Sequence, residues 1–88
     1  MEREERFQEL EEIREGIVEI LLELHPDMEV ESLALVDERI LDSFDIITLV
    51  TQIREEFDVV VPAERILPQY FNSANALSEM ILELMEEE

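Results

Sequence analysis

The apolar residues between Phe7 and Leu24 recur every three or four positions, and this spacing constrains the fold more than any other feature of the sequence. Glutamates and Arg14 fill the opposite face, as in an amphipathic helix. The apolar positions are Phe7, Leu10, Ile13, Ile17, Ile20, Leu21 and Leu24. Because Pro26 disfavours helical backbone in the residue before it, we expect the helix to end near His25. Gly16 is the chain's single glycine, and we expect it to be tolerated there at about 1 kcal/mol relative to alanine.

A second amphipathic helix is predicted to start near Asp42 or Ser43. Acidic residues at this point suit the positive end of a helix dipole. Its predicted inward residues are Ile46, Ile47, Val50, Ile53 and Phe57. A last helix should be capped by Asn72 or Ser73, with Leu77, Met80, Ile81 and Leu84 turned inward.

Between these two helices the pattern is shorter and mixed. Val59 to Val61 reads locally like a strand, but it has no partner, so we expect a packed connection. Pro62 could open a short helix over Ala63 to Leu67, which Pro68 would end. Tyr70 and Phe71 should fill the core.

The predicted fold class is therefore all-α, a bundle of three main helices plus one short helix. A long ordered loop, residues 26–41, should join the first two helices, because it carries too many apolar residues for a free loop. We expect one domain over residues 1–88, an ordered core of about 7–85, and Phe57 and Phe71 near the centre of that core.

The charge of the chain limits its partners. It has 25 acidic and 6 basic residues, a formal net charge of −19, and no cysteine. Such a surface repels nucleic acid and anionic lipid, and it favours partners with basic patches. Disulfides and thiolate chemistry are excluded, and no apolar run reaches the roughly 20 residues of a membrane span. The polar N-terminus is unlike a secretory signal, so we expect a soluble, cytoplasmic monomer without membrane insertion.

The segment Leu41-Asp42-Ser43-Phe44-Asp45 is the strongest candidate for a functional site. Taken alone, a serine at a helix start is ordinarily a cap that satisfies a first-turn N–H group. His25 is interpreted as a helix-end residue. Because the sequence has no nucleophile–base pair and no cluster of metal ligands, we predict neither an enzyme nor a metal site.

The order of elements, with Asp42-Ser43-Phe44 before a helix that ends in Glu55-Glu56-Phe57, resembles the acyl carrier protein family. The resemblance runs from about Phe7 to Leu84. Leu41-Asp42-Ser43-Phe44 and Tyr70-Phe71-Asn72 look most like the D-alanyl carrier branch, which acts in cell-wall teichoic acid modification. This chain departs from that branch at Asp45, where glycine is usual, and at Ala74, where proline is usual.

The resemblance implies that Ser43 carries 4′-phosphopantetheine, attached by a phosphopantetheinyl transferase, with an acyl or aminoacyl group held as a thioester. Asp42 would help the transferase recognise the serine, and Phe44 would belong to the same site. The outer face of the second helix would dock an adenylating loading enzyme and acyltransferases. Its expected docking residues are Asp45, Thr48, Thr51, Gln52 and Glu55. The cargo stays open between a fatty acyl or polyketide chain, D-alanine and another amino acid.

Two interpretations without a prosthetic group remain. A calcium-binding loop would need a central glycine, which residues 26–41 lack. An acidic helical interaction or cation-binding module would leave the Asp42-Ser43 pair unexplained.

Overall fold

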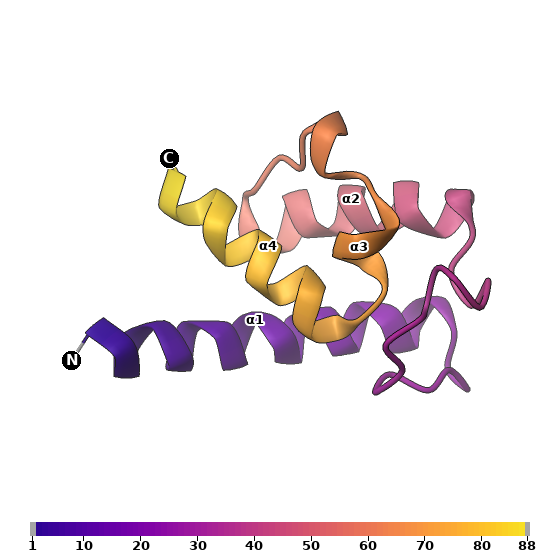
Figure 1. Ribbon diagram of the computed structural model, residues 1–88, viewed down its shortest axis with the longest axis horizontal. Coiled ribbons are helices and arrows are strands. Elements are labelled where there is room, and N and C mark those ends of the chain that lie inside the picture. The colour runs from indigo at the N-terminus through magenta and orange to yellow at the C-terminus, as the bar shows by residue number, and fades with distance from the viewer. Residues whose placement is uncertain (1, 88) are drawn as a thin grey trace.

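Two antiparallel helices, α1 (Glu2–Leu24) and α2 (Ser43–Phe57), form the frame of the molecule, and α4 (Ala74–Glu87) packs against α1 (Figure 1). The computed structural model describes the backbone of residues 2–87 and the side chains of residues 7–87. Across residues 2–87 the chain is all-helical and has no strand. A 3₁₀ turn, η1 (Ala63–Arg65), and a one-turn helix, α3 (Pro68–Phe71), link α2 to α4. The all-α prediction is confirmed.

The core lies where α1, α2 and α4 meet. Its Cα radius of gyration, 12.3 Å, is close to the roughly 12 Å expected of a compact chain of this length. Phe71 is fully buried, and most of the inward residues that the periodicity predicted in α1 and α4 are buried, but Phe7, the first residue of the predicted stripe, is 62% exposed. The largest fully buried side chains are Phe71, Ile17, Leu21, Leu35, Leu41, Leu49, Ile53, Leu77, Met80, Ile81, Leu82 and Val59.

Several helix ends lie where the sequence predicted them. α1 ends at Leu24, just before His25 and Pro26, and α2 begins at Ser43. Ser73 precedes α4, and its hydroxyl accepts a hydrogen bond from the Ala76 N–H at 3.0 Å, as a cap does. The helices extend beyond the expected core of 7–85, to Glu2 and Glu87, and residues 1 and 88 lie outside the described range.

Several local predictions were wrong. Ile47 was expected inward but is 66% exposed, whereas Leu49, absent from the predicted stripe, is 0% exposed. Two residues turn a helix by about 200°, so burying Leu49 and Ile53 against the bundle turns Ile47 outward. Pro68 was expected to end a short helix but begins α3, because the first residue of a helix needs no N–H donor. The helix predicted over 63–67 is only the 3₁₀ turn η1.

Gly16 allows α2 to approach α1 closely. A Cβ atom added to Gly16 would lie 2.7 Å from Cζ of Phe57, inside van der Waals contact. Phe57 is only partly buried, so it packs at the edge of the core and not at its centre.

The loop between α1 and α2 is ordered, as predicted, because it is tied to residues near the other end of the chain. The Asn72 side-chain oxygen accepts hydrogen bonds from the N–H groups of Val36 at 2.9 Å and Asp37 at 3.0 Å. The Asn72 carbonyl accepts from Leu35 N–H at 2.8 Å. Leu35 and Leu41 are buried beneath the loop. These contacts fix the point from which the chain enters α2.

Candidate functional site

Ser43 is the first residue of α2, and the residue before it caps the helix. The Asp42 Oδ1 atom accepts the Asp45 backbone N–H at 2.8 Å, and Asp45 Oδ2 accepts the Asp42 backbone N–H at 3.3 Å. This reciprocal pair is a capping box, in which two side chains satisfy two orphan donors of the first turn. The capping role that a serine at this point would ordinarily have belongs to Asp42.

Ser43 is an exposed residue, and its hydroxyl group forms no hydrogen bond within the part of the chain that the structure describes. The hydroxyl groups of the other three serines in the sequence all form hydrogen bonds. Ser32 accepts from Ala34 N–H, Ser73 caps α4, and Ser78 donates to the Ala74 carbonyl. Ser43 therefore differs from them in having an accessible hydroxyl with no structural role.

The first turn of α2 offers a favourable place for negative charge. Its first two N–H groups, on Ser43 and Phe44, have no acceptor among residues 2–87. Such unpaired donors, together with the helix dipole, make a helix N-terminus suitable for a phosphate group. The residues present thus fit a phosphodiester on Ser43.

Phe44 and Ile47 form an exposed apolar pair beside Ser43. Phe44 is 77% exposed, and its three-residue spacing from Ile47 places both on one side of the helix. Thr51 and Glu55 continue the exposed surface towards the end of α2. The predicted docking residues Thr48 and Gln52 are half-buried at its margins. Sequence reasoning missed Ile47, whose outward position follows only from the burial of Leu49.

Asp45, predicted to face a docking partner, faces the end of α1. Its Oδ2 atom lies 2.7 Å from Nε2 of His25, and its side chain is 14% exposed. Burial disfavours the ionised carboxylate, but hydrogen bonds from His25 and from the Asp42 N–H outweigh burial and lower the pKa of Asp45. His25 was expected only as a helix-end residue, and no local signal connects it with Asp45.

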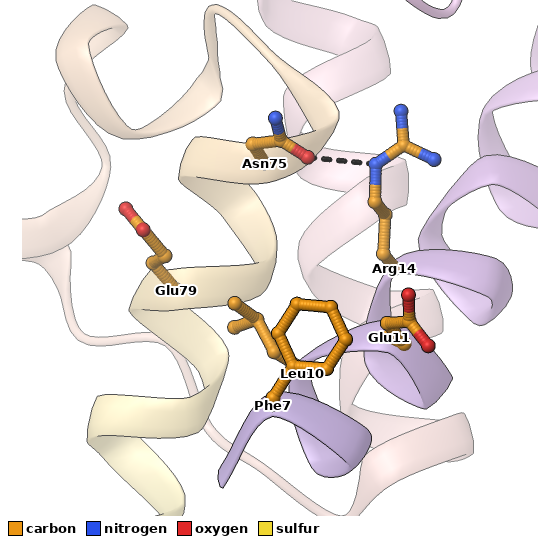
Figure 2. Close-up of a pocket in the computed structure, with 6 residues that line it drawn as sticks. All are labelled: Phe7, Leu10, Glu11, Arg14, Asn75 and Glu79. Atoms are coloured by element: carbon orange, nitrogen blue, oxygen red, sulfur yellow. Dashed lines mark hydrogen bonds between the residues drawn. The ribbon is translucent and has the colours of Figure 1, made fainter. Parts of the chain in front are cut away.

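A groove of about 320 Å³ lies on another part of the surface, between α1 and α4. Figure 2 shows its lining and the Arg14 side chain directed at Asn75, to which Arg14 Nε donates a hydrogen bond of 2.7 Å. Phe7 and Leu10 supply its apolar wall, and Glu11 and Glu79 add acidic groups. The start of α1 and the start of α2 lie at opposite ends of the molecule (Figure 1), and none of the residues that line the groove belongs to α2.

Three further observations bear on function. Among the described residues, no three histidine or acidic side chains are grouped as metal ligands would be. No helix within residues 2–87 has the length and apolar character needed to cross a membrane. No protein-family model matches the chain, and no curated protein matches it either.

Proposed function

We propose that this protein is a carrier of the acyl carrier type, with 4′-phosphopantetheine attached to Ser43. The proposal rests on the observation that Asp42, and not Ser43, caps α2. Asp42 caps the helix through Asp45 N–H, which leaves the exposed Ser43 hydroxyl available for modification.

The surroundings of Ser43 support this assignment. A phosphodiester there would lie at the positive end of α2, where a negative charge is stabilised by about 0.3–1 kcal/mol. When attached, the prosthetic group supplies a terminal thiol that holds an acyl group as a thioester. The chain contributes an exposed anchor at a helix end, and it has no cysteine or lysine side chain to compete for the cargo.

The chain acts, on this proposal, as a substrate of enzymes and not as an enzyme. Phe44, Ile47 and Thr51 provide an exposed, largely apolar face on which a transferase, a loading enzyme or an acyltransferase can dock beside Ser43. The net charge of −19 favours basic patches around that contact. Fatty acyl, polyketide and aminoacyl cargo, D-alanine included, remain alternatives for the thioester.

The exposed Phe44–Ile47 pair also supports a second candidate, a helical interaction module without a prosthetic group. Such a module would use the same face of α2 but would leave Ser43 unmodified.

Intact-protein mass spectrometry separates the two candidates. The wild-type protein, Ser43→Ala and Ser32→Ala are each incubated with coenzyme A and a broad-specificity phosphopantetheinyl transferase. We expect the mass of one phosphopantetheine to be added to the wild type and to Ser32→Ala, and none to Ser43→Ala. Modification that persists in Ser43→Ala would exclude this attachment site, and an unmodified wild type would favour the interaction module.

A further inference from the structure

A side-chain contact joins the end of α1 to the first turn of α2. His25 directly follows α1, and its Nε2 atom lies 2.7 Å from Oδ2 of Asp45. His25 is 41% exposed and Asp45 14%, so the contact is partly shielded from water. It spans 20 residues of sequence, across the whole loop that precedes Ser43.

The two helix ends favour opposite charges at this contact. The C-terminus of α1 favours a cation, which suits a protonated imidazole, and the N-terminus of α2 favours the Asp45 carboxylate. Further acidic residues lie next in the hydrogen-bond chain and in the sequence. Asp42 lies one hydrogen bond beyond Asp45, and Glu23 and Asp27 are two residues away on either side of His25 in the sequence.

The contact continues through the capping box to Ser43. Asp45 Oδ2 is shared between His25 and the Asp42 N–H, and Asp42 Oδ1 accepts the Asp45 N–H. Ser43 and Phe44 lie between the two aspartates. Fixing the Asp45 carboxylate therefore fixes both ends of the turn that presents the Ser43 hydroxyl.

We propose that His25 is a positioning residue for Ser43, which holds Asp45 and thereby locks the first turn of α2 against the end of α1. The lock itself follows from the His25–Asp45 contact. Only its role in presenting Ser43 rests on the proposed function. The bond strengthens when the imidazole carries a proton, because it then joins two full charges.

The first test compares the backbone amide signals of Ser43, Phe44 and Asp45 by NMR in the unmodified wild-type, His25→Leu and His25→Gln proteins at one pH. We expect these signals to shift in His25→Leu, whose side chain cannot donate to Asp45. They should stay close to their wild-type positions in His25→Gln, because the glutamine amide can donate to Asp45.

The second test is amide hydrogen exchange at Asp45 and Ile46, whose N–H groups donate to Asp42. Removing a hydrogen bond to a charged group should speed their exchange roughly tenfold in His25→Leu. His25→Gln should restore slow exchange, and the matched control Asp27→Asn should behave like the wild type. The Ile53 amide serves as the internal reference for global unfolding.

Exchange at Asp45 and Ile46 that stays at the wild-type rate in His25→Leu, or first-turn amide signals that do not shift in His25→Leu, would overturn the positioning role. Both measurements are independent of whether Ser43 accepts a prosthetic group. A protein that passes them but is never modified would refute the carrier function and leave the His25–Asp45 lock in place.

Discussion

Replacing Gly16 with alanine should leave unchanged or lower the stability of the wild type, but it should raise the stability of the Phe57→Leu variant. In an open helix interior the change from glycine to alanine stabilises by about 1 kcal/mol. In this chain the new Cβ would meet the Phe57 ring, at 2.7 Å from Cζ, 3.4 Å from Cε1 and 3.7 Å from Cε2.

The size of the opposing effect follows from these distances. Carbon atoms pack best at about 3.5–4.0 Å, so the ring or α2 must move by roughly 1 Å. Overpacking of this kind costs about 1–3 kcal/mol. Gly16→Ala should therefore be neutral to about 2 kcal/mol destabilising in the wild type. Leucine at position 57 lacks all three of the crowded ring atoms, so in Phe57→Leu the same change should stabilise by up to about 1 kcal/mol.

Urea unfolding followed by circular dichroism measures the four proteins of this double-mutant cycle. The expected coupling is about 1–3 kcal/mol, which corresponds to several degrees in Tm for a domain of this size. Glu23→Ala, an exposed alanine substitution two turns further along α1, is the matched control and should show no coupling to Phe57→Leu. If Gly16→Ala stabilised both backgrounds equally, glycine would not be needed for the approach of the two helices.

Three further predictions use the same unfolding measurements. Leu49→Ala should destabilise by about 2–5 kcal/mol, whereas Ile47→Ala on the same helix should change stability by no more than about 0.5 kcal/mol; equal costs would show that Ile47 is buried. Because the folded-state pKa of Asp45 is lowered, its carboxylate stabilises the fold above pH ~4, and this stability is lost as the pH falls through the folded value. The difference in unfolding free energy between the wild type and Asp45→Asn should therefore become smaller at acid pH. A difference that does not change with pH would contradict the expectation that Asp45 is ionised in the folded protein. The net charge of −19 predicts that salt stabilises the fold. Raising the ionic strength from about 0.01 M to 0.15 M shortens the screening length from about 30 Å to about 8 Å and should raise the Tm at neutral pH. A Tm insensitive to salt would show that charge repulsion does not limit stability.

The positions of α1, α2 and α4 were predictable because their signals are local. The end of α1 follows from Pro26, and the caps Asp42 and Ser73 stand directly before α2 and α4. The buried face of α2 was harder to predict. Apolar residues surround much of that helix, so the local pattern permits either Ile47 or Leu49 to face inward. Only the packing of α2 on the rest of the core decides between them.

Contacts between distant segments could not be predicted from the sequence at all. Asn72 holds the loop before α2 through residues 35 or 36 positions away, and His25 reaches Asp45 across 20 positions. Neither pair lies at a helical or strand spacing, so no periodic signal marks them. Each becomes visible only when the loop closes on the core through Leu35 and Leu41.

The difference between a serine that caps α2 and one whose hydroxyl makes no hydrogen bond is, in this chain, a shift of one residue. The sequence allowed α2 to start with either Asp42 or Ser43 as its cap. Had Ser43 been the cap, its hydroxyl would have been turned into the first turn as an acceptor for backbone N–H groups. The Asp45 carboxylate favours Asp42 as the cap, because it lies three residues after Asp42 and accepts a hydrogen bond from the Asp42 N–H. With Asp42 as the cap, the Ser43 hydroxyl lies outside the capping box. His25 contacts the Asp45 carboxylate that completes this box. The acids on either side of Ser43 thus determine whether its hydroxyl is available, in addition to any attraction they exert on a partner.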